Sequence, residues 1–400
     1  MKEHLMRLSM SMSQELDSIL AFWSKETVDE RQGGFYGEIS SGMDVHYDAP
    51  KGLVLNARIL WTFASACRHR FTPRYRALAD RAYRYLLDYF LDSKHGGYYW
   101  SVDSTGEKLN GKKQIYGQAF VVYAFAEYYR ATGMPQALEH AQTLFRLIEE
   151  KGCDRVHGGY FEAYAEDWSA TDDYSLSSKD LNESKSMNTH LHVLEAYTNL
   201  YRIWPSDTLR NQLAALIDVT AERIVDPASG HFRLFFDDEW HVKSDHISYG
   251  HDIEGSWLLL EAAETLGEPE LIARMQQLAV RMAEAVYMRG LDDDGALFNE
   301  AGPHGLIDDA KDWWPQAEAV VGFVNAYGLT NDERYLTAAL RAWEFIERYM
   351  IDRVHGEWHE QLSRDRKPNA AKNKVDAWKC PYHNARACLE IIERAGALKT

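Results

Sequence analysis

The sequence predicts an all-α fold, an (α/α)6 barrel in which six helix pairs close into a toroid. Three observations predict it: a glycine-centred segment recurs six times, two helical patterns follow the copies, and the last helix finds its partner at the start of the chain. Short β-hairpin loops are expected at one mouth of this barrel. Since no linker rich in Pro or Ser interrupts the repeats, we expect one catalytic domain over residues 1–400.

The repeated segment begins with an aspartate and contains one or two glycines. Its leading glycine stands at Gly33, Gly96, Gly158, Gly230, Gly295 and Gly356, with separations of 63, 62, 72, 65 and 61 residues. In each copy we expect the aspartate to end a helix and the glycine to take turn conformations that other residues resist. An aromatic pair such as Phe35 and Tyr36 then predicts a short β-stretch.

Six helix pairs are expected in order along the chain. Apolar residues three or four apart, as at Leu191, Leu194 and Tyr197, indicate helices rather than strands. The expected pairs are 52–70 with 74–91, 114–131 with 135–151, 187–201 with 209–217, 250–266 with 269–288, and 313–328 with 332–350. The helix over 379–394 would pair with the helix over 5–24, and this pair closes the ring.

Charge and composition exclude several classes of protein. A net charge of −17 gives no broad basic surface for phosphate backbones, so nucleic acid is not an expected partner. No apolar run approaches the roughly 20 residues that span a bilayer. The first 20 residues lack the apolar stretch of a secretory signal. The four cysteines form no pair with metal-type spacing, which favours free thiols in a reducing cytoplasm.

The toroid brings the long loops and the N-termini of the inner helices to one mouth. Those N-termini carry partial positive charge and spare N–H donors, which favour electron-rich ligands. The residues there are Asn56, Arg58, Tyr116, Gln118, Asn188, His190, His192, His251, Glu254, Trp313, Trp314, Glu318, Trp378, His383 and Asn384. Histidines that converge with an arginine and carboxylates indicate proton-transfer chemistry on a polar organic molecule.

Helical spacing suggests how some of these side chains are arranged. His251 and Glu254 are three residues apart, so the carboxylate is expected to hold the imidazole tautomer. His190 and His192 point about 200° apart on a helix, so one of them faces the cavity and His190 is interpreted as structural. Trp313 is expected in the core, whereas Trp314 and Trp378 are candidate sugar platforms.

Cofactor motifs are missing from the sequence. It contains no GxGxxG fingerprint and no HExxH helix, and the phosphate-loop-like stretch 106–113 lacks its final Ser or Thr. We expect no cofactor and no metal, although a grouping of His192, His251 and His383 stays open as a metal site.

At these motifs the chain resembles the cellobiose 2-epimerases, relatives of the N-acylglucosamine 2-epimerases. The resemblance covers nearly the whole chain and is most specific over 51–61, 186–195, 248–254, 313–318 and 378–384. It implies an (α/α)6 barrel and cofactor-free inversion at C2 of the reducing-end glucose of β-1,4-linked disaccharides. Gly255 and Ala385 depart from the pattern, where relatives more often carry Ala and Gly, which bears on fine geometry and rate.

The resemblance also implies roles for individual residues. His251 and His383 match the acid/base pair, while His192 and Arg58 match residues that hold O1 and O2 and stabilise an enediolate. Tyr116, Asp180, Asn188, Glu254, Glu300, Trp314, Glu318 and Trp378 match positions that bind or orient the substrate, Asp180 and Glu300 less closely. Chemically, two histidines on opposite faces of a sugar and a permanently charged arginine suit reversible inversion through an enediolate.

Other functions stay open at this point. The same barrel could carry a glycoside hydrolase that uses Glu254 and Glu318, or a sugar-binding module that uses Trp314 and Trp378. Among epimerases, the preferred sugar is open between cellobiose, mannobiose, lactose, mannose and N-acylglucosamine, as is side isomerisation to the ketose. A closed toroid needs no partner to cover its edges, so a monomer is expected.

Overall fold

The computed structural model describes residues 2–178 and 180–397. The described residues form twelve α-helices. These are α1 (Lys2–Lys25), α2 (Leu53–His69), α3 (Pro73–Tyr85), α4 (Ile115–Thr132), α5 (Pro135–Lys151), α6 (Met187–Tyr201), α7 (Asp207–Val219), α8 (Tyr249–Leu266), α9 (Pro269–Arg289), α10 (Trp313–Thr330), α11 (Glu333–Phe345) and α12 (Tyr382–Ala397). The helices α3, α7 and α11 each continue into one π-helical turn, η1 (Leu86–Phe90), η2 (Thr220–Ile224) and η3 (Ile346–Met350). All six predicted helix pairs are therefore confirmed.

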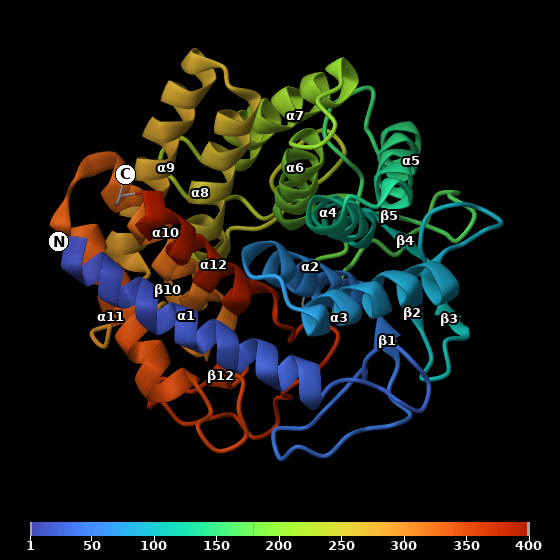
Figure 1. Cartoon of the computed structure of the whole chain (residues 1–400). Helices are drawn as coiled ribbons and strands as arrows, with labels where there is room; N and C mark the ends of the chain where they lie inside the picture. Colours follow the sequence, from blue (N-terminus) through green and yellow to red (C-terminus); the bar gives the residue numbers. More distant parts are fainter. Residues whose placement is uncertain (1, 179, 398–400) are drawn as a thin grey trace.

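The even-numbered helices form a closed inner ring. In the order α2, α4, α6, α8, α10 and α12, each packs against the next, and α12 packs against α2. Each inner helix also packs against one outer helix: α3, α5, α7, α9 and α11 follow their inner partners, and α1 covers α12. Figure 1 shows α1 in blue beside α12 in red, with both chain ends on the same side. The predicted (α/α)6 toroid is confirmed.

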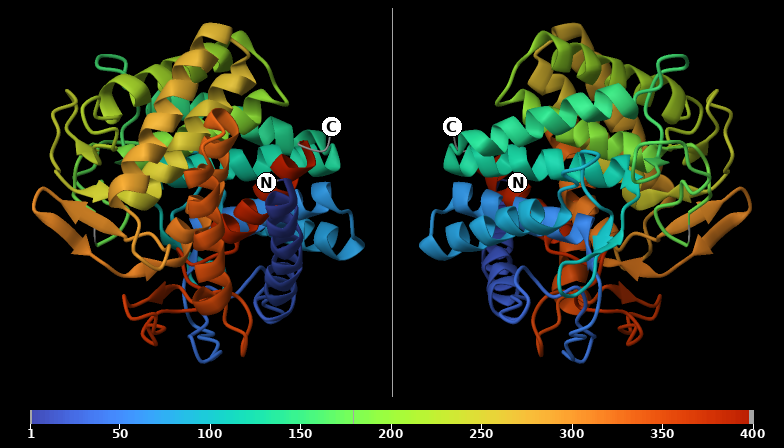
Figure 2. Two further views of the ribbon diagram at one scale, coloured as in Figure 1. Left: turned by 90° about the vertical axis from the view of Figure 1, so that its left-hand side faces the viewer. Right: turned by 90° about the vertical axis from the view of Figure 1, so that its right-hand side faces the viewer.

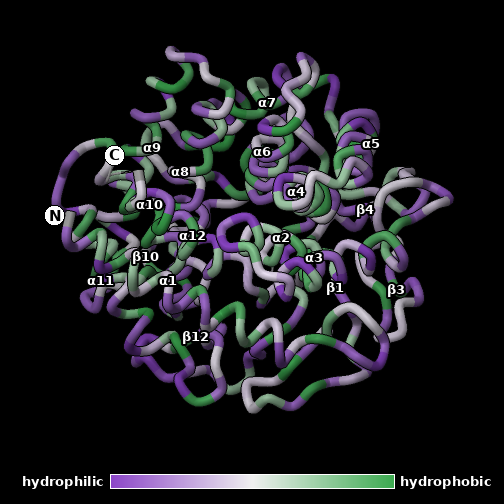
Figure 3. Tube along the Cα trace, in the orientation of Figure 1, coloured by the Kyte–Doolittle hydropathy of each residue, from purple (hydrophilic) through white to green (hydrophobic). Residues whose placement is uncertain are grey.

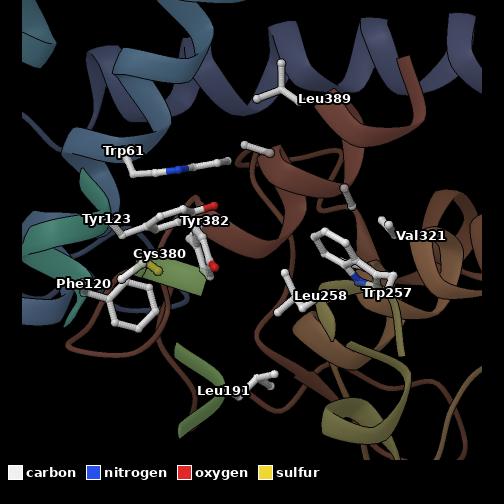
Figure 4. Packing of buried hydrophobic residues seen from close by; sticks show 14 of the residues in the cluster. Trp61, Phe120, Tyr123, Leu191, Trp257, Leu258, Val321, Cys380, Tyr382 and Leu389 are labelled. Carbon is white, nitrogen blue, oxygen red and sulfur yellow. The ribbon is translucent and has the colours of Figure 1, made fainter. Parts of the chain in front are cut away.

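Burial separates the two rings. Every residue of α2 from Leu53 to Cys67 is buried, because this helix contacts neighbours on all sides. The outer helices are amphipathic: α5 buries Ala137, Ala141 and Leu144 and exposes polar residues between them. Hydrophobic and hydrophilic residues accordingly alternate along the outer helices in Figure 3. Figure 4 shows part of the core that the inner helices enclose.

Short strands join neighbouring repeats at the mouth. They are β1 (Lys51–Gly52), β2 (Ser101–Val102), β3 (Lys108–Asn110), β4 (Lys113–Gln114), β5 (Ala163–Tyr164), β6 (Lys185–Ser186), β7 (Phe235–Phe236), β8 (Ile247–Ser248), β9 (Glu300–Gly302), β10 (Gly305–Asp308), β11 (Lys311–Asp312) and β12 (Gln361–Leu362). The antiparallel pairs β1–β2, β4–β5, β6–β7, β8–β9 and β11–β12 each link the strand before one inner helix to the loop of the next repeat. A bridge between Ile39 and Val375 makes the sixth link. In Figure 2 these loops lie together, away from the chain ends.

The recurring aspartate has a partner that the sequence motif did not reveal. In the first repeat, Asp29 Oδ1 accepts the backbone N–H groups of Arg31 and Gln32, and its Oδ2 lies 2.7 Å from Lys51 Nζ. The same buried ion pair joins Asp92 to Lys113, Asp154 to Lys185, Asp292 to Lys311 and Asp352 to Lys374. We call these five pairs the Asp–Lys clamps. Each fixes a glycine turn to the strand that leads into an inner helix.

The fourth repeat is built differently. Ile247 stands two residues before α8, where Lys51, Lys113, Lys185 and Lys311 stand before their inner helices, and Asp226 pairs with Arg233 instead. The glycine turns themselves are as predicted, with Gly33 and Gly34 both in the left-handed region at φ 81° and 64°. Within the described residues, no helix is long and apolar enough to cross a membrane.

Candidate active site

A cavity of about 450 Å³ opens at the mouth of the inner ring. The resemblance assigns roles to twelve residues, and eleven of them line the cavity: Arg58, Tyr116, Asp180, Asn188, His192, His251, Glu254, Glu300, Trp314, Trp378 and His383. Glu318 lies behind His383 rather than on the cavity wall. Trp313, expected in the core, is buried and also lines the cavity.

The helical register of the inner ring decides which side chains reach the centre. The sixth residue of successive inner helices is Arg58, Phe120, His192, Glu254 and Glu318. These side chains meet around the axis: Arg58 lies 4.3 Å above the ring of Phe120, which in turn lies 4.8 Å from the ring of His192. The position is therefore a ring of central residues contributed by different repeats.

The fourth residue of most inner helices instead bonds the glycine turn. Gln118 and Gln316 each bond the backbone of the turn in their own repeat, through both an acceptor and a donor. His190 takes this place in the third repeat, where its Nε2 accepts the N–H of Tyr160 and its Nδ1 bonds the carbonyl oxygen of Ser186. The interpretation of His190 as structural is confirmed.

His383 is held by a buried carboxylate. Its Nδ1 lies 2.7 Å from Glu318 Oε1, which leaves Nε2 for the cavity. Burial lowers the pKa of His383 well below its usual value, and the nearby cations Arg58 and Arg386 lower it further. Burial conversely raises the pKa of Glu318. The ring centroid of His383 lies 5.4 Å from that of Trp314.

His251 also lies against Trp314 and has a different partner. Its ring centroid is 4.6 Å from that of Trp314, and its Nδ1 lies 2.7 Å from Ser248 Oγ. Burial, with His192 and Arg58 nearby, lowers the pKa of His251 to about 3. The prediction that Glu254 holds the His251 tautomer is wrong. Ser248, just before the helix, reaches the imidazole first.

Glu254 instead belongs to a carboxylate cluster around Arg386. One guanidinium bonds Glu195, Glu254 and Glu318, the last at 2.6 Å. Burial raises the pKa of Glu254 to about 7, with Glu318 adding to the shift and Arg386 opposing it. Burial would also raise the pKa of Glu195, but Arg386 and His192 outweigh it and bring the pKa to about 2.

Arg386 is the central residue that sequence reasoning missed. If Asn384 is aligned with Gln316, Arg386 is equivalent to Glu318. Arg386 is therefore the sixth member of the ring of central residues. Its guanidinium carbon lies 4.9 Å above the ring of Trp257. This alignment of the inner helices could have identified Arg386 from the sequence. Without the alignment, an arginine at this place resembles an ordinary surface residue.

His192 and Arg58 make up the remaining wall of the cavity. His192 Nδ1 lies 3.0 Å from Glu195 Oε2, so this histidine also has a carboxylate partner. Arg58 donates from Nη2 to the hydroxyl of Tyr116 at 2.8 Å and contacts Cys380 Sγ through Nη1 at 3.8 Å. Its side chain is buried and stays protonated in this setting.

The structure also bears on the question of a metal. Among the described residues, one group of acidic and histidine side chains is close enough to share an ion, namely Glu254, Glu318 and His383, with ligand atoms within 4.8 Å of one another. The guanidinium of Arg386 already lies against both of these carboxylates. The grouping of His192, His251 and His383 does not form such a cluster.

The outer part of the cavity holds the predicted sugar-binding side chains. Trp378 packs between Trp100 and Tyr116, at centroid distances of 6.2 Å and 5.9 Å. Asp180 Oδ2 accepts a hydrogen bond from Ser177. Sequence reasoning missed three further polar residues on this wall, Glu162, Asn299 and Glu360. Each is the fourth residue after the leading glycine of its repeat, so alignment of the repeats brings the three to one position.

Comparison with known proteins places the chain among sugar epimerases. Residues 34–387 match the family described as N-acylglucosamine 2-epimerase. The chain is 46% identical to a cellobiose 2-epimerase from Bacteroides fragilis, over 96% of this chain and 98% of that one. It is 39% identical to a cellobiose 2-epimerase from Dictyoglomus turgidum, over 94% and 96% of the two chains. The solved cellobiose 2-epimerase from Bacillus thermoamylovorans superposes with a TM-score of 0.93 at 40% identity, covering 97% of this chain and 99% of that one.

Proposed function

Because the chain belongs to the N-acylglucosamine 2-epimerase family, we propose that it inverts C2 of the reducing-end glucose of β-1,4-linked disaccharides such as cellobiose. One observation carries the proposal: two imidazoles on different helices, His251 and His383, line one sugar-sized cavity and both lie against Trp314. Epimerisation needs two such groups, because a proton leaves one face of C2 and another arrives on the opposite face.

The proposed reaction begins with the open-chain aldehyde. One imidazole takes the C2 proton, the electrons of that C–H bond form the C1–C2 double bond, and the carbonyl electrons move to O1. Arg58 stabilises the charge on O1, and His192 is proposed to bond O1 or O2. The other imidazole, protonated at the start, delivers its proton to the opposite face of C2 as the carbonyl reforms. The two histidines have then exchanged protonation states, as a reversible reaction requires.

Burial favours one half of this exchange, the delivery of a proton, and opposes the other half, the uptake of one. It lowers the pKa of both His251 and His383, so each imidazolium is a stronger acid than free imidazolium. Glu318 bonds His383 at the nitrogen away from the cavity and compensates by stabilising its protonated state. The side chains Tyr116, Asp180, Asn188, Glu300, Trp314 and Trp378 are proposed to bind the disaccharide along the cavity wall, and Glu254 and Glu318 to orient the histidines and Arg386.

The hydrolase alternative is less compatible with the carboxylates. A glycosidase needs two carboxyl groups on either side of a glycosidic bond, roughly 5–10 Å apart. Glu254 and Glu318 instead bond the same guanidinium of Arg386. Their carboxylate oxygens lie within 4.8 Å of each other on one side of a shared cation, rather than facing each other across a bound glycosidic bond.

The first experiment is proton NMR of cellobiose incubated with the protein and EDTA in D2O. We expect a mannose-type reducing-end signal with deuterium at C2, produced without a metal ion. Free glucose would indicate a hydrolase. An unchanged spectrum would direct the same assay to mannobiose, lactose, mannose and N-acylglucosamine, and then to the binding-module alternative.

We also propose that the protein acts as a cytoplasmic monomer with a single catalytic domain. All four cysteines are free, and Cys67, Cys380 and Cys388 are buried, which suits a reducing compartment. The inner ring closes within one chain. Light scattering at micromolar concentration tests the monomer directly, and a stable dimer would contradict it.

A further inference from the structure

One residue from each repeat stands at an equivalent place on the cavity rim. It is the fourth residue after the leading glycine, and we call these six the rim residues: Gly37, Trp100, Glu162, Leu234, Asn299 and Glu360. The carbonyl oxygens of five of them accept the N–H of the first residue in the preceding inner helix: Trp100 from Leu53, Glu162 from Ile115, Leu234 from Met187, Asn299 from Tyr249 and Glu360 from Trp313. Four of the rim residues, Glu162, Leu234, Asn299 and Glu360, line the cavity, and these bonds fix their backbones beside it.

Two of the polar rim residues have their hydrogen bonds within the protein. Glu162 accepts from the N–H of Ser186 and from the hydroxyl of Thr189, one with each carboxylate oxygen. Asn299 donates to Asp308 and accepts from the N–H of Asp312. Both side chains are engaged in fixing the loops and helix starts around them.

Glu360 differs from both. Its Oε1 accepts from Lys372 Nζ at 2.9 Å, whereas its Oε2 is buried and has no hydrogen-bond partner among the described residues. The side chain is only 10% exposed and lines the cavity, and Lys372 lines it as well. A buried acceptor without a partner is unfavourable, because it has lost its bond to water without replacing it. A ligand that donates a hydrogen bond would remove that cost.

The location of Glu360 indicates which part of a ligand it meets. Its backbone holds the first residue of α10, so it lies at the start of the helix that carries Trp314. His251 and His383 lie against Trp314, and Glu360 and Lys372 line the same cavity. A reducing-end ring placed between the histidines would therefore direct the second sugar ring toward Glu360 and Lys372. Neighbouring hydroxyls of a sugar both donate and accept, which matches a carboxylate beside an ammonium group.

We propose that Glu360 accepts a hydrogen bond from a hydroxyl of the non-reducing sugar ring, with Lys372 donating to its neighbour. This pair then selects disaccharides over monosaccharides. The inference rests on the proposed epimerase function, and it names residues that recognise the half of the substrate where no bond changes.

The variant Glu360→Gln tests this proposal. The amide has the shape of the carboxylate, and its oxygen can still accept a hydrogen bond from Lys372. Its NH2 group replaces the unpaired acceptor Oε2 by a donor. We expect the KM for cellobiose to rise at least about tenfold, as for loss of a hydrogen bond to a charged group, with kcat within about threefold. The inhibition constant of mannose against cellobiose, which reports the reducing-end position alone, is expected to stay unchanged. Glu166→Gln is the matched control, since Glu166 pairs with Lys108 at 2.9 Å and does not line the cavity.

Monodeoxy cellobioses altered on the non-reducing ring identify the hydroxyl. One of them should raise the KM of the wild-type protein and add nothing further in Glu360→Gln, as expected when both changes remove the same contact. A purely structural Glu360 would raise KM equally for every analogue and shift the inhibition constant of mannose, which would overturn the proposal, as would an unchanged KM for cellobiose.

Failure of the epimerase function would be seen separately, as a wild-type protein that leaves cellobiose unchanged. In that case calorimetry replaces kinetics. Glu360→Gln should weaken cellobiose binding about tenfold or more and leave glucose binding unchanged. Equal affinities of the wild-type protein and the variant for cellobiose would then overturn the inference about Glu360 on its own.

Discussion

Each cavity histidine has a different partner at Nδ1, and that partner sets how readily the ring carries a proton. Ser248 offers His251 a hydroxyl, which can donate or accept and so follows the ring through both protonation states. Glu318 offers His383 a carboxylate, which favours the imidazolium. The two histidines are therefore unequal, because a carboxylate partner favours the protonated ring of His383 and a hydroxyl partner leaves His251 without that charge.

Removal of each partner should reveal this inequality. Glu318→Gln is expected to lower kcat about 10²–10⁴-fold, because a neutral amide does not stabilise the imidazolium of His383. Ser248→Ala is expected to lower kcat only about tenfold, since the hydroxyl fixes the ring of His251 without charge. Steady-state kinetics on cellobiose in both directions measures this, and equal losses in the two variants would contradict it.

Arg386 compensates the charge of three buried carboxylates, so its loss should reduce stability as well as activity. Arg386→Met leaves Glu195, Glu254 and Glu318 without their shared cation. We expect a loss of about 3–5 kcal/mol in unfolding free energy, as for a broken buried ion pair. Arg386→Lys should recover part of the thermal stability but little of the activity, because an ammonium cannot bridge the three groups. A thermal midpoint unchanged in Arg386→Met would refute the expectation.

At the scale of elements, the register of the inner helices separates support from chemistry. The fourth residue of an inner helix secures the glycine turn, and the sixth faces the axis, as His190 and His192 show within a single helix. The sequence pattern predicts this division, because helical geometry alone turns residues i and i+2 to opposite sides. It also locates the helices, since their apolar periodicity is strong.

What the sequence could not predict depends on contacts between repeats. The spacing of His251 and Glu254 allows a hydrogen bond but does not select Glu254 over Ser248. Arg386 and the five lysines of the Asp–Lys clamps become recognisable only when the repeats are superposed. Glu360 stands out only once the partners of the other rim residues are known, because its distinguishing feature is an unused acceptor.

His190 should make the protein sensitive to acid through its element rather than through catalysis. Burial lowers the pKa of His190 to about 4 from its usual 6.5. The unfolded chain therefore binds more protons between these values, and stability falls as the pH decreases from about 6.5 to 4. His190→Gln places there the residue that two other repeats use, and it removes up to about 3 kcal/mol of this loss. Thermal midpoints at pH 7 and 4.5 measure it, with the exposed His304→Gln as control. An equal drop in wild type and His190→Gln would contradict it.

The Asp–Lys clamps give a second prediction at this scale. Lys113→Met leaves Asp92 buried without its cation, and we expect a loss of about 3–5 kcal/mol. The double variant Asp92→Asn with Lys113→Met should be less destabilised than Lys113→Met alone, because no charge is then left unpaired. The fourth repeat, with Ile247 at the lysine position, shows that this fold accommodates an apolar residue there. Denaturation by heat tests the order of the three proteins.

At the scale of the whole molecule, α1 is a part of the ring although it lies far from α12 in sequence. It buries Leu5, Met12, Leu16, Ile19 and Trp23 against the rest of the core. Deletion of residues 1–25 would uncover the outer face of α12. We expect the truncated chain to aggregate or to lose its sharp thermal transition, whereas a monodisperse and active truncated protein would contradict this.

Because neighbouring repeats of the barrel complete one another, the ring is stable only when every repeat is in place. Five inner helices have their first N–H bonded by the loop of the following repeat, and the bridge from Ile39 to Val375 joins the sixth repeat to the first. A single isolated repeat would lack the neighbouring loop that bonds the start of its inner helix. A seventh repeat would find no open position in the closed ring. The ring thus depends on bonds made between repeats, and the rim residues contribute backbone carbonyl oxygens to those bonds whatever side chain they carry.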